Sequence, residues 1–78
     1  MEVQHHHAMA ELFSQLGLDS RNAAIDQFIR DNHLRHQDGE LYRAIFWNPA
    51  QAQFIKQAIE EDAQWAEVVD ELDTRLRR

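Results

Sequence analysis

Residues 48–78 read NPAQAQFIKQAIEEDAQWAEVVDELDTRLRR, and this stretch decides the fold. Its first four residues, Asn48-Pro49-Ala50-Gln51, offer an N-cap side chain, a proline at the first helical position and a glutamine that can bond back to the cap. After this start, residues spaced alternately three and four apart form one stripe that is apolar except at a single position. The stripe consists of Ile55, Ala58, Asp62, Trp65, Val69, Leu72 and Leu76. The spacing predicts helix, with one face that must be covered by apolar groups.

Asp62 is the polar member of this stripe. A buried carboxylate without a partner would cost several kcal/mol, on the order of the whole stability of a small domain. As an N-cap, Asp62 would instead end one helix near Glu61 and begin another at Ala63. We therefore predict two helices, at about 49–61 and 63–77, in preference to a straight rod. A single helix kinked at Asp62 is the alternative.

The first part of the chain holds a predicted leader and a short helix. Residues 1–7 contain three consecutive histidines and are predicted to be a disordered leader outside the folded domain. A helix is predicted from about Met9 to Leu16, because its apolar residues share one face. Gly17 follows directly and is placed to close the helix in a left-handed conformation, with Leu18 folding back as the accompanying apolar contact.

A second amphipathic helix is predicted from about Arg21 to Asn32, with Asp19 or Ser20 as its N-cap. Its apolar face consists of Ala24, Ile25, Phe28 and Ile29. From residue 33 to 47 the helical periodicity fails, and the stretch 37–40 is typical of a turn. This connection is too apolar for a free linker, so we expect it to lie against the helices, with a short helical turn at 41–45.

The elements together predict an all-α protein: a compact bundle of about four short helices in one domain, 8–78, with an irregular connection at 33–47. A strand interpretation finds little support, because β-branched residues are few and do not alternate with polar ones. A chain of 78 residues buries only about 60% of its unfolded surface, so its apolar faces are needed for stability.

Charge and composition exclude several classes of function. The formal net charge is −6 and disfavours nonspecific binding to nucleic acid or to an anionic membrane, and no apolar run is long enough to span a bilayer. There is no cysteine, which excludes disulfides and thiolate metal sites. Between Glu60 and Asp73 there are seven acidic residues and no basic one, a run typical of a solvated face. We expect a cytoplasmic protein.

Catalytic and cofactor motifs are hard to find. The two glycines lie too far apart for a phosphate-binding loop, and no Glu-x-x-His pair of a di-iron bundle occurs. Ser20 is expected to cap a helix and not to act as a nucleophile. His33 and His36 are three residues apart, but no closed set of four zinc ligands surrounds them. We therefore expect no catalytic residue, no metal ligand, no cofactor and no enzymatic activity.

Two functional hypotheses remain. The first is a non-enzymatic protein–protein interaction module that binds itself or another protein through the C-terminal amphipathic helices. Its candidate interface residues are Phe54, Ile55, Trp65, Val69, Leu72, Leu76 and Trp47. The alternative is a small-molecule or metal binder near the 33–47 connection, where Tyr42, Trp47, His33 and His36 gather. In either case the apolar stripe can also close the core of a monomer against the first two helices.

Three segments resemble a known family. They are AELFSQLGL (10–18), FWNPAQAQFI (46–55) and EDAQWAEVVDELD (61–73). They resemble a family of small bacterial proteins known as domain of unknown function 2789. The resemblance implies a compact helical domain in the bacterial cytoplasm, and it implies no catalytic or binding residues. The leader is expected to lie outside the resemblance.

Overall fold

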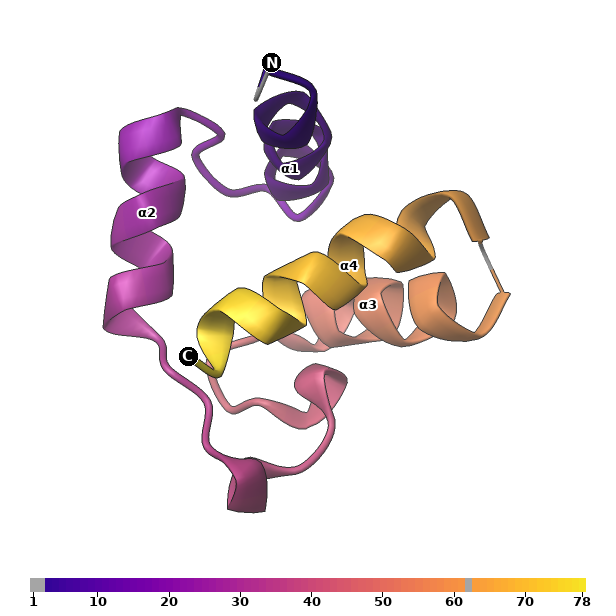
Figure 1. Cartoon of the computed structure of the whole chain (residues 1–78). Helices are drawn as coiled ribbons and strands as arrows, with labels where there is room; N and C mark the ends of the chain where they lie inside the picture. Colours follow the sequence, from indigo (N-terminus) through magenta and orange to yellow (C-terminus); the bar gives the residue numbers. More distant parts are fainter. Residues whose placement is uncertain (1–2, 62) are drawn as a thin grey trace.

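The computed structural model describes residues 3–61 and 63–78. Over these residues the chain forms α1 (Val3–Gln15), α2 (Asn22–Asp31), the 3-10 helices η1 (His36–Asp38) and η2 (Leu41–Arg43), α3 (Pro49–Glu61) and α4 (Ala63–Leu76) (Figure 1). The described residues contain no strand. The prediction of an all-α bundle with four helices and an irregular connection is therefore confirmed.

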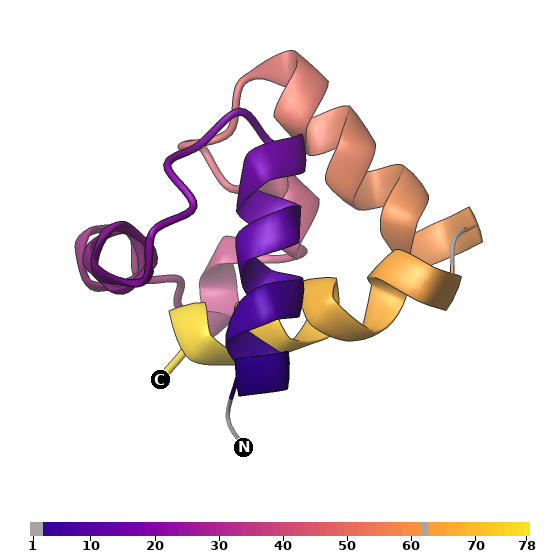
Figure 2. The ribbon, with the colours of Figure 1, turned by 90° about the horizontal axis from the view of Figure 1, so that it is seen from above.

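α3 and α4 form a helical hairpin whose arms diverge from the junction (Figure 2), and α3 begins as the sequence predicts. Asn48 Oδ1 accepts a hydrogen bond from the Gln51 N–H at 2.8 Å, and Gln51 Oε1 accepts one from the Asn48 N–H at 2.9 Å. This is the reciprocal capping box. The two helices contact each other and do not continue in line, which confirms two helices over a straight rod (Figure 1). The predicted cap at Asp62 lies outside the described residues.

α4 is the central element of the core. It packs against α3, and α1 crosses it at a steep angle (Figure 2), while α2 contacts it near its C-terminal end. Three residues of its stripe, Val69, Leu72 and Leu76, are fully buried. The buried set is completed by apolar residues from α1, α2, η2, α3, the connections and α4 itself: Met9, Leu12, Phe13, Leu16, Ile25, Leu34, Leu41, Ala44, Trp47, Ile55, Ala58 and Val68. The stripe thus closes the core of a single chain.

The start of α1 corrects one prediction. The helix begins at Val3 and not near Met9, so it includes residues 3–7 of the predicted leader. No glycine or proline stands between Val3 and Gln15, and each residue added to an existing helix gains one backbone hydrogen bond. The end of α1 is as predicted.

Gly17 closes α1 with a φ of 73°. The Leu18 N–H donates to the Phe13 carbonyl at 2.8 Å, and the Gly17 N–H donates to the Ser14 carbonyl at 3.0 Å. This pattern is the Schellman motif, which leaves the last carbonyls of a helix paired. The Gln51 side chain also donates to the Leu16 carbonyl at 2.8 Å, which ties the end of α1 to the start of α3.

The start of α2 differs from the prediction, because Arg21 and not Asp19 or Ser20 is the N-cap. The Asp19 carboxylate is occupied by Arg21 itself: it accepts the Arg21 backbone N–H at 3.1 Å and the guanidinium Nη2 at 2.6 Å. These hydrogen bonds with Arg21, side chain first, lower the pKa of Asp19 from 3.8 to about 2. The ion pair holds the Asp19 carboxylate on Arg21, and the N-cap makes no side-chain capping hydrogen bond.

We predict that Arg21→Gln raises the pKa of Asp19 toward 3.8, because the substitution removes the guanidinium that favours the charged carboxylate. In the wild-type protein the lowered pKa favours the folded state above pH about 4, and this contribution is lost as the pH falls toward 2. An NMR titration of the Asp19 carboxyl resonance measures the pKa. Arg30→Gln on α2 is the matched control and should leave it unchanged; a pKa that is equally low in Arg21→Gln contradicts the prediction.

Candidate functional site

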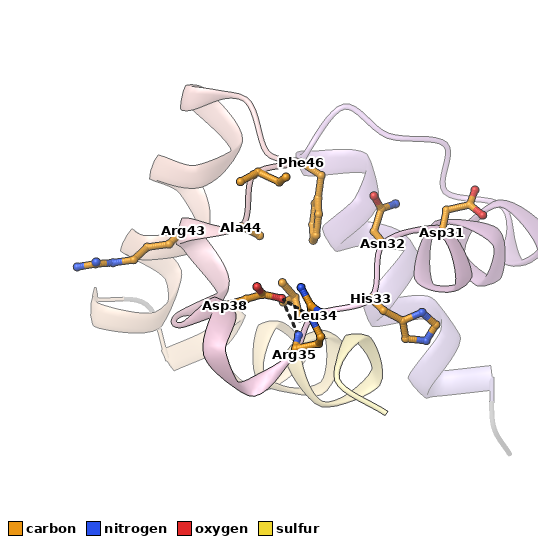
Figure 3. A pocket seen from close by; sticks show the side chains of 10 residues that line it. Asp31, Asn32, His33, Leu34, Arg35, Asp38, Arg43, Ala44 and Phe46 are labelled. Atoms are coloured by element: carbon orange, nitrogen blue, oxygen red, sulfur yellow. Dashed lines mark hydrogen bonds and ion pairs between the residues drawn. The ribbon is translucent and has the colours of Figure 1, made fainter.

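A pocket lies along the connection between α2 and α3. Its volume is about 570 Å³. Apolar residues form one part of its lining and charged or polar residues the other. The lining residues are Asp31, Asn32, His33, Leu34, Arg35, Asp38, Arg43, Ala44, Ile45 and Phe46 (Figure 3).

The C-terminal end of α4 fixes one side of this pocket. The Leu34 N–H donates to the Leu76 carbonyl at 2.8 Å. The Arg77 guanidinium donates to the carbonyls of Arg35 at 3.1 Å and Gly39 at 2.6 Å. Its Nε donates to Asp73 Oδ1 at 2.6 Å, so all three nitrogens are engaged. A single arginine thus holds both ends of the turn that carries η1.

η1 places a charged pair on the pocket rim. The Arg35 N–H donates to Asp38 Oδ2 at 2.7 Å, and the Arg35 Nε lies 4.0 Å from the same oxygen. Gly39 follows with a φ of 79°, a conformation that a side chain would strain. Figure 3 shows the Arg35–Asp38 pair and Leu34 opposite Ala44 and Phe46, while the guanidinium of Arg43 points away from the pocket.

Aromatic rings packed against one another support the opposite wall of the pocket. The Phe46 ring centroid lies 4.8 Å from that of Trp47 and 5.6 Å from that of Phe28, with both pairs edge-to-face. Phe28 also meets Phe13 of α1 edge-to-face at 5.4 Å. The buried Trp47 donates its indole N–H to the Leu41 carbonyl at 3.0 Å, which holds η2 against the same cluster. The wall is therefore anchored in the core.

Ile45 stands out on this wall. Its side chain is 99% exposed, while Ala44 before it is buried and Phe46 after it is half-buried. In the described part of the chain, the other large hydrophobic residue with high exposure is Ile59, at 46%. An isoleucine beside an apolar pocket with a polar rim has the composition of a protein contact surface. We call Leu34, Ala44, Ile45 and Phe46 with the surrounding rim the Ile45 face.

The structure does not assemble the cluster predicted around the two histidines. His33 lines the pocket, but His36 lines a separate hollow with Arg43 and Arg77. Trp47 is buried with its N–H already bonded, and the Tyr42 ring lies 5.7 Å from both Lys56 Nζ and Arg43 Cζ. Among the residues whose placement is described, no group of three His, Cys, Asp or Glu residues could hold a metal ion.

Most of the predicted interface residues lie inside the molecule. Five of them are buried in the core of one chain: Ile55, Val69, Leu72, Leu76 and Trp47. The chain itself covers them, because a chain of this size needs its apolar stripe for its own core. Phe54 and Trp65 are half-buried, near the end of the α3–α4 hairpin, and remain accessible.

Sequence reasoning missed Ile45. In the sequence it stands between Ala44 and Phe46 in a stretch without helical or strand periodicity. Periodicity is the signal that separates buried from exposed apolar positions, so the pattern gave no reason to distinguish Ile45 from its neighbours.

Comparison with known proteins identifies a family whose model matches this chain. A family model described as "Protein of unknown function (DUF2789)" matches residues 1–76 of the 78-residue chain. The match begins at residue 1, so the expectation that the leader lies outside the resemblance is wrong. No curated protein and no solved structure matches the chain. None of the helices in the described residues is long and apolar enough to cross a membrane.

We predict that Arg77→Met destabilises the turn that carries η1 at the edge of the pocket. The substitution removes the donors to the Arg35 and Gly39 carbonyls and should lower the free energy of unfolding by about 1–3 kcal/mol. Amide hydrogen exchange should accelerate at Asp38 and Gly39, and chemical denaturation measures the stability. The matched control is Arg78→Met at the next position, where we expect little change. Equal effects of the two substitutions would show that Arg77 does not hold the turn.

Proposed function

We propose that this chain, which belongs to the DUF2789 family of proteins of unknown function, is a non-enzymatic interaction module that forms a homodimer through the Ile45 face. The observation that carries the proposal is the 99% exposure of Ile45 beside a pocket of about 570 Å³. The occupant we assign to the pocket is Ile45 of a second copy.

The shape of the Ile45 face supports the binding of a second copy of the chain. The exposed side chain and the pocket that would receive it lie on the same face, since Ile45 itself lines the pocket. A two-fold axis through such a face lets each copy insert its isoleucine beside Leu34 and Phe46 of the other, as an isologous interface requires. The pocket walls are held by the core on one side and by Arg77 on the other, so little ordering is needed on binding.

The distribution of charge also supports association through the Ile45 face. Two copies that each carry a net charge of −6 repel one another. The pocket lining carries little net charge: the Arg35 guanidinium offsets one of the two aspartates, Asp31 and Asp38, and the Arg43 guanidinium points away (Figure 3). Association through this face keeps the excess negative charge of each copy away from the contact, where salt screens it.

The free energy available from this contact limits the strength of the dimer. Burial of one isoleucine side chain contributes about 1.5–3 kcal/mol, and the symmetric contact buries two. The loss of translational and rotational freedom on association costs about 4–15 kcal/mol, which the remaining contacts must offset. The dimer is thus weak and reversible, as suits a module that exchanges partners.

A small-molecule ligand is the second candidate. A volume of about 570 Å³ falls in the range typical of small-molecule pockets, and this pocket lies in the predicted connection. A ligand there would be contacted by the Phe46 ring and the polar rim. For location we propose the bacterial cytoplasm, which the family resemblance and the absence of cysteine support.

The dimer is tested by sedimentation equilibrium of wild-type protein, Ile45→Glu and Ile59→Glu from about 10 μM to about 1 mM, a range that covers weak association. We expect wild type and Ile59→Glu to dimerise with rising concentration and Ile45→Glu to stay monomeric, because the glutamate places two like charges in the contact. Ile59 is the matched control, as an exposed isoleucine away from the pocket. A wild-type monomer at 1 mM, or equal weakening by both substitutions, rejects the dimer.

A further inference from the structure

We propose that the end of the α3–α4 hairpin binds a methylated ammonium group. The site is a pocket of about 230 Å³ lined by Phe54, Gln57, Ala58, Glu61 and Trp65. It is separate from the Ile45 face and does not rest on the proposed dimer. Figure 1 shows the end of the hairpin well away from the connection between α2 and α3.

Two aromatic rings form the corner of the pocket. The centroids of Phe54 and Trp65 lie 5.6 Å apart, and the ring planes meet at 73°. Both side chains are half-buried, so they are held by the core while part of each ring stays open to solvent. In this edge-to-face pair one ring turns its edge to the face of the other, and both rings line the pocket. The negatively polarised ring surface that the pair leaves uncovered attracts a cation.

A carboxylate completes the site. Glu61, at the last turn of α3, lines the same pocket and is exposed. Aromatic faces combined with a carboxylate are the groups that recognise quaternary and methylated ammonium ions, because the ligand is both cationic and apolar at its surface. Ala58 is buried and contributes a small apolar side chain to the lining, which leaves room for the methyl groups.

The surrounding charge favours a cation. Glu60, Glu61 and Glu67 are exposed and near the pocket in sequence, which favours a cation, whereas Glu71 and Asp73 further along α4 are paired with Arg75 and Arg77. Tyr42 offers a contrast within the same molecule: its ring is already contacted by the chain's own Lys56 and Arg43. In the described part of the chain no lysine or arginine lies over the rings of Phe54 or Trp65, so these faces remain available.

Two sources can supply this chemistry: a free metabolite with a trimethylammonium group, or a methylated lysine of another protein. The probes are therefore choline, a trimethyllysine peptide, and 3,3-dimethylbutan-1-ol, which has the shape of choline without its charge. Binding is followed by NMR through the Trp65 indole resonance, with Trp47 as an internal reference because it is buried.

We expect saturable binding of choline or of the peptide, and at least about ten-fold weaker binding of the neutral alcohol, since the recognition depends on charge. Phe54→Leu and Glu61→Gln should each weaken binding about 2- to 30-fold, the range of one cation–π contact or one partly exposed charge pair. Glu67→Gln is the matched control, an exposed acidic residue of α4 outside the pocket, and should bind like wild type.

If choline binds more tightly than the peptide, the natural ligand is a metabolite; if the trimethyllysine peptide binds more tightly, it is a methylated protein. Thermal unfolding of each variant confirms that it is folded, and Glu61→Gln changes no buried group. The proposal is overturned if the alcohol binds as tightly as choline, if neither cation shifts the Trp65 resonance, or if Glu61→Gln and Phe54→Leu both bind like wild type.

Discussion

The burial of the α4 stripe is the constraint on which the rest of the structure depends. α4 contacts the three other α-helices, and Val69, Leu72 and Leu76 have no exposed surface. A chain of 78 residues has little apolar area beyond what its core requires. Most of the apolar residues that looked available for a partner are therefore committed to the fold. In the described residues, the accessible apolar groups that we propose for recognition are Ile45 on the connection and the Phe54–Trp65 pair at the hairpin end.

Local chemistry made much of the fold predictable. The capping box at Asn48 and Gln51, the left-handed Gly17 and the spacing of the stripe each act within a few residues, so the sequence displays them directly. The start of α2 was missed because two signals competed: Asp19 is a good cap, but the nearby Arg21 guanidinium takes its carboxylate. The start of α1 was missed because no residue marks it.

The candidate sites were predictable only in part, because long-range contacts build them. The pocket at the connection depends on Arg77, which donates to carbonyls 38 and 42 residues away in the sequence. Neither hydrophobic periodicity nor a sequence motif predicts hydrogen bonds between residues so far apart in the sequence. The angle between Phe54 and Trp65 likewise arises from the packing of α3 on α4. Sequence reasoning marked both aromatic residues as candidates, but it did not bring them together.

The bonds from residues 76 and 77 back to the connection also set an order for folding during synthesis. Leu34 pairs with the Leu76 carbonyl, and Arg77 holds the turn at Gly39. Closing loops of this length carries an entropy cost that only the completed contacts offset. On the ribosome, the segment from 33 to 47 therefore cannot take its final shape until the last turn of α4 has emerged. Until then Leu34 and the turn at Gly39 lack the hydrogen bonds with Leu76 and Arg77 that fix them, and the apolar groups of this segment stay exposed to aggregation.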